Sequence, residues 1–327
     1  MEQVQMASDA DKSPIELLLS NVAWAFENPD SSFPDRLKAA VEDGSIQSDI
    51  ALQMDFIAPR SPSLSRDPGE DRPKICLHIT FLELLWASIY GWMVIYEDGI
   101  QKPMLAGTYS GAIKFETPEL VRANHLIDWA KLMAKNYRSW PENLPAPNRY
   151  ATEREKWYGE KANRVFQEAA SFCLIHEFSH ASYDHLTVVG DYQGDWRLQI
   201  KLELEKDADN AAFNTLVPNG LDETERLSKG WAILGLMLTS FYLANGVSGI
   251  FQRGHLPLHH RLDHLRRYLN FQEEKHRFYF DYLCSTFLEL FIREAGLDCE
   301  PRIFETAQDA LDAKLNLLDG YMAHLTS

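Results

Sequence analysis

Apolar residues recur every three or four positions along most of this chain, but two short stretches in its first third alternate instead. Residues 50–56 and residues 75–81 place an apolar side chain at every second position. Successive side chains of a strand point to opposite faces of a sheet, so both stretches predict half-buried strands. The segment between them, residues 59–73, is rich in proline, serine and charged residues, which predicts a loop or a boundary between structural units.

Helical spacing and capping residues predict that most of the remaining chain is helical. Ser13-Pro14 and Thr117-Pro118 each place a capping residue before a proline suited to a first helical turn. The predicted helices are 13–27, a short one from Pro34, 81–96, 117–137, 152–183, 198–216, 223–251, 259–295 with a break, and 305–325. The fold is therefore expected to be α+β and mostly α. We expect a small N-terminal α/β module of unassigned role over 1–72 and a larger domain over 73–327.

One predicted helix contains an uncharged run that is long enough to cross a membrane. Residues 231–251 hold no charged side chain over 21 positions. Glycines at positions 235, 246 and 249 interrupt the run, and a helix buried on all sides of a large protein is equally apolar. A buried core helix is therefore favoured, and a membrane span stays an alternative. Residues 81–96 also predict a buried helix, because Glu83 lies inside them.

Net charge and cysteine content indicate which cellular compartment and which kinds of partner to expect. The net charge of −16 would repel a phosphate backbone or an anionic membrane surface, so nucleic acid is not an expected partner. The four cysteines are far apart and form no Cys-x-x-Cys pair, which is typical of buried thiols in a reducing compartment. The N-terminus lacks the basic and apolar regions of a secretory signal. These features predict a cytoplasmic protein.

Residues 176–180 read His-Glu-Phe-Ser-His and lie inside the helix predicted over 152–183. Positions four apart share one face of a helix, so His176 and His180 can bind one metal ion while Glu177 lies beside them. A zinc ion lowers the pKa of a bound water, and a neighbouring carboxylate takes the proton as the water attacks a carbonyl carbon. The spacing therefore predicts a catalytic zinc site with Glu177 as the general base.

A catalytic zinc site needs a third protein ligand, and the predicted helix 198–216 offers carboxylates. Glu205 and Asp209 stand four residues apart, so Glu205 can bind the metal while Asp209 orients a bound imidazole. Two other candidates for the third metal ligand fit less well. His185 is one residue out of the register of a metzincin ligand, and Glu203 lies about 200° around the helix from Glu205. A solvated acidic helix face is the ordinary alternative for such carboxylates.

This arrangement resembles the gluzincin metallopeptidases, in which His-Glu-x-x-His is followed by Glu-x-x-x-Asp on a later helix. Residues 255–262, His-Leu-Pro-Leu-His-His-Arg-Leu, are similar to the segment ending in arginine that often follows the third ligand. The resemblance implies a zincin-like catalytic domain with a small sheet and a long helix that bears the motif. It also implies a donor for the oxyanion, for which His255 and Arg261 are the candidates, with His259 and His260 left open.

Among gluzincins the chain is most similar to the bacterial Lit-type phage-exclusion peptidases, over roughly residues 75–327. That resemblance implies a zinc-dependent endopeptidase that cleaves a cytoplasmic protein, with elongation factor Tu as the candidate substrate in phage defence. Two other functions stay open. One is a membrane-associated gluzincin peptidase that uses residues 231–251 as a span. The other is a non-catalytic regulator that keeps zinc for folding, although such a site has no need of a base at Glu177.

Overall fold

The computed structural model describes residues 12–244, 255–297 and 303–326. Its N-terminal part consists of three helical segments, η2 (Glu16–Leu18), α1 (Leu19–Glu27) and α2 (Phe33–Glu42). Three strands follow, β1 (Ala51–Gln53), β2 (Ser63–Ser65) and β3 (Lys74–His78). The remaining described elements are helical: α3 (Ile79–Tyr96), η3 (Glu97–Gln101), α4 (Lys102–Leu105), α5 (Pro118–Lys135), α6 (Glu153–Ser182), α7 (His185–Gly190), α8 (Gly194–Leu216), α9 (Glu223–Leu243), α11 (Leu258–Leu269), α12 (Glu274–Glu294) and α13 (Ala307–Thr326). The predicted α+β fold, mostly α with a small sheet, is confirmed.

The three strands form one sheet in the order β1-β3-β2. β1 pairs parallel with β3, and β2 pairs antiparallel with it, so that Ser63 lies opposite Cys76. β2 falls inside the segment that the sequence predicted as a loop. It has only three residues, and its partner β3 supplies the pairing that its own sequence does not signal. The strand predicted over 75–81 ends at His78, and α3 begins directly after it.

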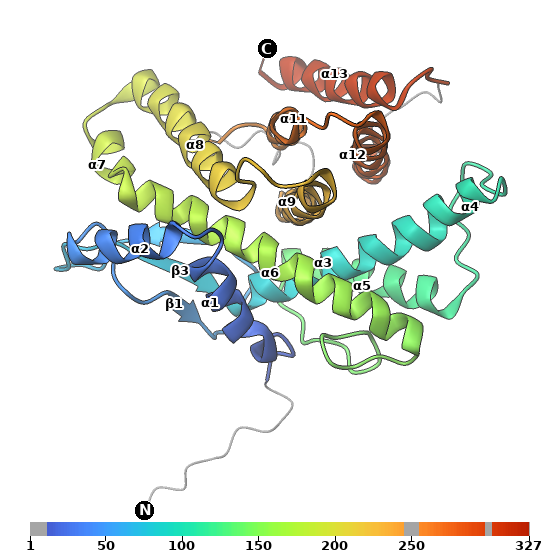
Figure 1. Cartoon of the computed structure of the whole chain (residues 1–327), viewed down its shortest axis with the longest axis horizontal. Helices are drawn as coiled ribbons and strands as arrows, with labels where there is room; N and C mark the ends of the chain where they lie inside the picture. Colours follow the sequence, from blue (N-terminus) through green and yellow to red (C-terminus); the bar gives the residue numbers. More distant parts are fainter. Residues whose placement is uncertain (1–11, 245–254, 298–302, 327) are drawn as a thin grey trace, which may run out of the picture.

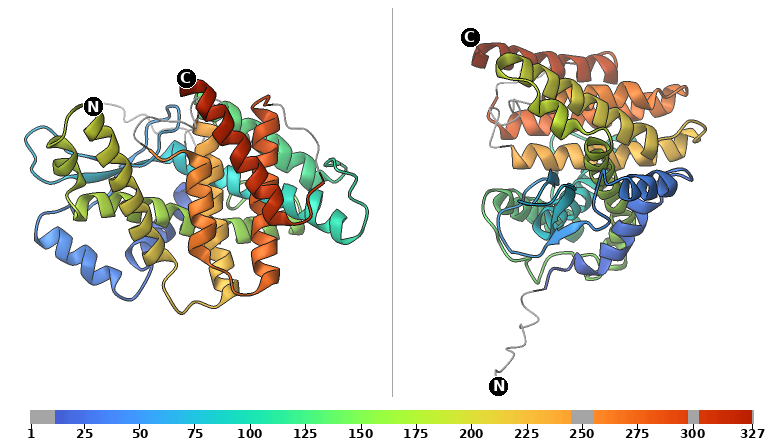
Figure 2. Two further views of the ribbon diagram at one scale, coloured as in Figure 1. Left: turned by 90° about the horizontal axis from the view of Figure 1, so that it is seen from above. Right: turned by 90° about the vertical axis from the view of Figure 1, so that its left-hand side faces the viewer.

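Helix α6 runs through the middle of the molecule and organises the other layers (Figure 1). α1 and α3 pack against it, and α8 and α9 pack against it as well. α11 and α12 contact α9, and α13 lies over both of them as an outer layer (Figure 2). The helix that carries the His-Glu-Phe-Ser-His motif is therefore covered by helices from both halves of the chain.

The two apolar helices that could have been membrane spans lie in the core. Every residue of α3 is buried, and Ala232, Ile233 and Leu234 of α9 are completely buried. Gly235, which interrupts the uncharged run, faces α3 so closely that an added Cβ would lie 2.7 Å from Ile89. Residues 245–251 of that run lie outside the described chain. Within the described residues, one stretch, Ile79–Leu105, has the length and hydropathy of a membrane span, and its apolar window is entirely buried.

The long C-terminal helical run divides at Asn270, where the sequence predicted a break without placing it. Asn270 has a φ of 41°, in the left-handed region that asparagine tolerates better than most residues and that commonly ends a helix. α11 ends there and α12 starts four residues later. The turn allows α12 to pack back against both α9 and α11.

Residues on both sides of the predicted boundary at 72/73 contribute to one core and one sheet. Phe33 of α2 packs edge-on against Phe178 of α6, with ring centroids 5.0 Å apart. The Ser13 hydroxyl donates a hydrogen bond of 2.6 Å to the buried carboxylate of Glu83. The two predicted units are thus in direct contact, and the boundary itself stays a prediction.

Candidate metal centre

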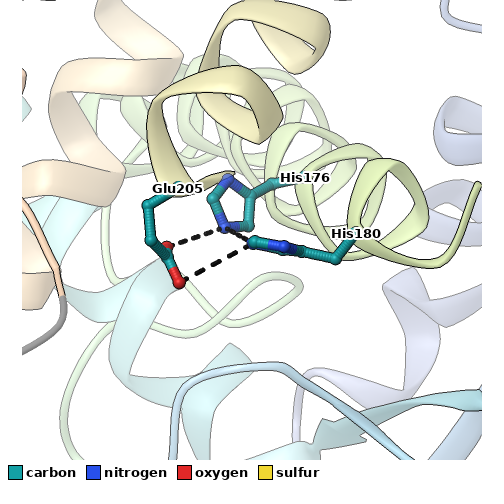
Figure 3. Close-up of side chains that lie close together, drawn as sticks. All are labelled: His176, His180 and Glu205. Carbon is teal, nitrogen blue, oxygen red and sulfur yellow. Dashed lines mark hydrogen bonds and ion pairs between the residues drawn. The ribbon is translucent and has the colours of Figure 1, made fainter. Parts of the chain in front are cut away.

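Two histidines of α6 direct their ring nitrogens at one point. His176 and His180 lie one turn apart, and their Nε2 atoms are 3.1 Å apart (Figure 3). The helix is fixed in rotation because Phe172 and Phe178 are buried in the core, and Thr152 caps its first turn by accepting a backbone hydrogen bond. The face that carries both imidazoles is therefore held toward α8.

Helix α8 brings the carboxylate of Glu205 to the same point. Glu205 Oε2 lies 3.5 Å from His176 Nε2, and Oε1 lies 3.8 Å from His180 Nε2 (Figure 3). α8 is anchored on α6 by Phe213, whose ring meets Phe172 edge-on at 5.2 Å. Glu205 is itself buried, so its charge is removed from bulk water.

The donor atoms of these three side chains are spaced as ligands of one small divalent metal ion would be. Bonds of 2.0–2.1 Å in a tetrahedral zinc site place neighbouring ligand atoms about 3.3 Å apart. The separations of 3.1, 3.5 and 3.8 Å among the donors lie close to that spacing. His176, His180 and Glu205 therefore form a group that could hold a metal ion.

The electrostatics of the group favour positive charge at its centre. Burial alone would raise the pKa of Glu205, but His176, His180 and His255 outweigh it and hold that pKa well below its ordinary value. Burial alone would lower the pKa of His176, but the carboxylates of Asp209 and Glu205 outweigh it and raise that pKa to about 10. A proton or a divalent cation can supply the positive charge that these carboxylates stabilise.

Asp209 lies one helical turn beyond Glu205 and contacts the other nitrogen of a candidate ligand. Its Oδ1 is 3.0 Å from Nδ1 of His176, as expected for a residue that orients the imidazole. Arg261 of α11 donates two hydrogen bonds to Asp209, from Nε to Oδ2 at 2.9 Å and from Nη2 to Oδ1 at 2.6 Å. The sequence proposed Arg261 as a donor to the oxyanion. The structure places both of these bonds on Asp209 instead, so Arg261 acts on the centre through Asp209, and direct contact with a substrate stays a prediction.

His185 makes a contact that the sequence analysis missed. Its spacing is out of register for a metzincin metal ligand, yet its Nδ1 lies 2.9 Å from Nδ1 of His180. Asp184, with a φ of 50°, reverses the chain after α6 and lets α7 carry His185 back onto that histidine. One of the two nitrogens donates to the other, which orients His180 with Nε2 toward Glu205. An aspartate at the end of a helix was the available signal, since aspartate tolerates the left-handed turn.

The histidines of residues 255–260 separate into two groups. His255 places Nδ1 3.0 Å from Glu205 Oε2 and lines the cleft beside the centre, with 41% of its side chain exposed. His259 and His260 instead direct Nε2 at Asp319 of α13, at 2.9 and 2.6 Å. Of the three histidines, His255 is therefore the one placed to contact a molecule bound at the candidate metal centre.

Glu177 lies next to the ligands and lines the same cleft. Burial raises the pKa of its carboxyl group, and this outweighs the opposite influence of His176 and His180. A carboxylate with a raised pKa accepts a proton more readily near neutral pH. The side chain is only half-buried, so it can be reached from the cleft.

The model of one known family, Peptidase U49, matches residues 75–282 of this chain. That range is well over half of the 327 residues and contains every residue of the centre described above. The chain belongs to the peptidase U49 family. No curated protein and no solved structure matches it.

The centre of this U49 peptidase opens into a cleft of about 750 Å³. The cleft is walled by residues 61–64 around β2, by α7 and α8, and by the apolar side chains of α9. His176, Glu177, His180 and Glu205 all line it. A ligand in the cleft therefore reaches the candidate metal ligands and the candidate base together.

Proposed function

We propose that this U49 peptidase is a zinc-dependent endopeptidase of the gluzincin type. His176, His180 and Glu205 are the proposed zinc ligands, and Glu177 is the proposed general base. The observation that carries the proposal is the convergence of two imidazole nitrogens and one carboxylate within 3.8 Å, beside Glu177, in the cleft of a peptidase. Two histidines and a glutamate form the protein ligand set of catalytic zinc in several peptidases.

A few side chains of the cleft carry out the steps of the proposed reaction. When bound, zinc supplies a Lewis acid that polarises the attacking water and the scissile carbonyl. Glu177 accepts the proton of the water at its carboxylate and then delivers it to the leaving nitrogen. His255 is the proposed donor to the oxyanion, because it lies at the cleft wall beside Glu205.

Contacts behind the ligands support a site that is oriented before the substrate binds. Asp209 holds Nδ1 of His176, and His185 holds Nδ1 of His180, so both rings keep Nε2 toward the cleft. Arg261 fixes Asp209 through two hydrogen bonds. A catalytic site gains from such fixed geometry, since its ligands need not reorganise during the reaction.

The proposed substrate is a cytoplasmic protein, with elongation factor Tu as the leading candidate in phage defence. The resemblance to Lit-type peptidases supports this substrate. A membrane-associated peptidase is the first alternative, and the packing of Gly235 of α9 against Ile89 of α3 favours the core helix over it. A non-catalytic zinc protein is the second alternative, and the position of Glu177 in the cleft argues against that.

Metal analysis of the purified protein tests the ligand set. We expect about one zinc per chain, and a loss of zinc in each of His176→Ala, His180→Ala and Glu205→Ala. Glu203→Ala is the matched control, since Glu203 lies on the same helix and pairs with Lys206 on the surface. Zinc lost from the Glu203 variant but retained in the Glu205 variant would show that the third ligand is wrong.

Incubation with purified elongation factor Tu, with and without phage lysate, tests the proposed substrate. A discrete fragment that requires the lysate is the expected product. Rapid cleavage of unfolded casein without any added factor would contradict the idea of an enzyme that waits for a phage signal. Intact elongation factor Tu under both conditions would remove this substrate from the proposal and leave the peptidase assignment in place.

A further inference from the structure

The cleft contains two basic side chains that the metal centre does not use. Arg197 and Lys201 of α8 both line it, and among the described residues neither has a carboxylate within ion-pair distance. Among the residues that the structure describes, the acidic side chains that line the cleft are Glu177 and Glu205, and both belong to the centre. The chain as a whole carries a net charge of −16, so two unpaired cations in its cleft are a departure from the rest of the molecule.

Helix stability does not account for the position of Arg197. α8 begins at Gly194, so Arg197 lies in the first turn of the helix. The unpaired backbone N–H groups of a first turn make a cation there unfavourable. Arg197 is exposed, lines the cleft and pairs with none of the described acidic residues, so its guanidinium is available to an anionic group that enters the cleft.

The spacing of these cations along α8 matches the spacing of side chains in an extended peptide. Arg197, Lys201 and Glu205 are four residues apart and lie on one face of the helix, with steps of about 6 Å along its axis. An extended peptide rises about 3.3 Å per residue, and every second side chain points to the same side. Two acidic side chains at alternate positions can therefore meet Lys201 and Arg197 at the same time.

Apolar side chains also line the cleft. α9 contributes Leu236 and Leu243, with Ser240 between them, and Leu256 lines the cleft as well. The intervening side chains of the same extended peptide point away from α8. The cleft thus offers a bound strand both cations and an apolar surface.

We infer that this peptidase selects substrate segments with acidic side chains at alternate positions beside the scissile bond and apolar side chains between them. Lys201 and Arg197 are the specificity-determining residues, and Lys201 is the nearer of the two to the metal ligand Glu205. The inference deepens the proposed endopeptidase function by naming its substrate class, and it rests on that function for the position of the scissile bond.

Peptide binding to the full-length Glu177→Gln protein tests the inference without requiring turnover. Three labelled peptides share an alternating sequence in which every second residue is leucine and the others are glutamate, glutamine or lysine. Fluorescence anisotropy should show the glutamate peptide binding about fivefold more tightly than the glutamine peptide, since two partly exposed ion pairs contribute about 0.5 kcal/mol each. Added salt should reduce this difference.

Charge reversal at Arg197 and Lys201 tests whether these two side chains cause the preference for glutamate. Arg197→Glu combined with Lys201→Glu should abolish the preference for glutamate and favour the lysine peptide. Lys206→Glu is the control, because Lys206 lies on the same helix, pairs with Glu203 and does not line the cleft. It should keep the preference for glutamate, and circular dichroism should show that all variants are folded.

The outcomes separate the inference from the proposed function. Glutamate and glutamine peptides that bind equally, or a double variant that behaves like Lys206→Glu, overturn the inference. Absence of measurable binding of the glutamate peptide at millimolar concentration overturns it as well. If the glutamate preference holds but wild-type protein cleaves none of the three peptides even in the presence of phage lysate, the inference stands and the proposed endopeptidase function fails.

Discussion

Both candidate ligands on α6 are supported at the ring nitrogen that faces away from the centre. Asp209 supports His176, and His185 supports His180, each at 3.0 Å or less. The two supports differ in chemistry, because Asp209 lies at ion-pair distance from its histidine without hydrogen-bond geometry, whereas His185 and His180 can each donate to or accept from the other. The orientation of His180 therefore depends on the tautomers of two histidines.

Removal of the His185 side chain is predicted to weaken metal binding. His185→Ala should lower the affinity for zinc by about tenfold or more, because the residue that orients a metal-bound histidine typically contributes that amount. Competition with a chelator measures the affinity. His125→Ala is the control, since His125 is exposed on α5. Equal affinities in the two variants would show that His185 does not support the centre.

Removal of Asp209 is predicted to destabilise the fold. Asp209→Ala leaves the guanidinium of Arg261 without its partner, and that side chain is only 17% exposed. Breaking a buried ion pair on one side typically costs about 3–5 kcal/mol. Urea denaturation of the metal-free protein should show a loss of this order. Asp207→Ala, at an exposed site on the same helix, should change the free energy of unfolding by less than about 0.5 kcal/mol.

The sequence predicts those site residues whose relative positions are set by a single helix. His176, Glu177 and His180 share a face through helical periodicity alone, and Glu205 could be expected beside them because Asp209 follows it by four residues. Asp184 signals a left-handed turn after α6, but no local pattern specifies that this turn brings His185 onto His180. The contact of Arg261 with Asp209 likewise depends on how α11 packs, which no local pattern specifies.

At the scale of whole elements, α3 approaches two neighbouring helices closely at glycine positions. It meets α5 at Gly91, where an added Cβ would lie 2.5 Å from Cγ1 of Ile127. It meets α9 at Gly235, which approaches Ile89. Glycine at each site lets two helices come together without a clash, so these positions set the distance between core helices.

A pair of glycine substitutions tests this packing. Gly91→Ala should destabilise the protein by about 1–3 kcal/mol, because the methyl group overlaps Ile127 in a fully packed core. Gly320→Ala, in α13 with no atom within 4 Å of the added Cβ, should stabilise by about 0.5–1 kcal/mol through helix propensity alone. Thermal denaturation compares the two. A stable Gly91 variant would contradict the close approach of α3 and α5.

Long elements could be predicted from the sequence, and short ones could not. Helices such as α5 and α6 were placed to within a few residues, because eighteen or more residues of regular spacing and a threonine cap specify them. β2 and α7 were missed because they have three and six residues. Such short elements are formed by contacts with β3 and α6 rather than by their own pattern.

At the scale of the whole molecule, the first described residues are tied to the core by a buried carboxyl group. Glu83 of α3 is 1% exposed and accepts a hydrogen bond from Ser13. Burial raises the pKa of Glu83 to about 7, although the bond from Ser13 acts in the opposite direction. The contact joins segments on either side of the predicted boundary at 72/73.

Because the pKa of Glu83 is raised in the folded protein, the free energy of unfolding should fall as the pH rises. The folded protein holds a proton on Glu83 that the unfolded chain releases near pH 4.5, so folding is favoured less as the pH rises from there through about 7. Glu83→Gln keeps an acceptor for Ser13 and does not titrate. Between pH 5 and pH 8, wild type should lose about 2 kcal/mol of stability relative to this variant. A stability difference between wild type and Glu83→Gln that does not change with pH would show that Glu83 does not have a raised pKa.

Hydrolysis of cellular proteins in the presence of phage lysate tests whether this chain is a zinc peptidase that uses Glu177 as its base. Wild-type protein stripped of metal, the same protein reloaded with zinc, and zinc-loaded Glu177→Gln are each incubated with the same mixture and compared by mass spectrometry of new peptide termini. We expect new termini in the reloaded wild type alone, together with equal zinc content in the Glu177 variant. New termini produced equally by the Glu177 variant, or by the metal-free protein in the presence of a chelator, would contradict this mechanism.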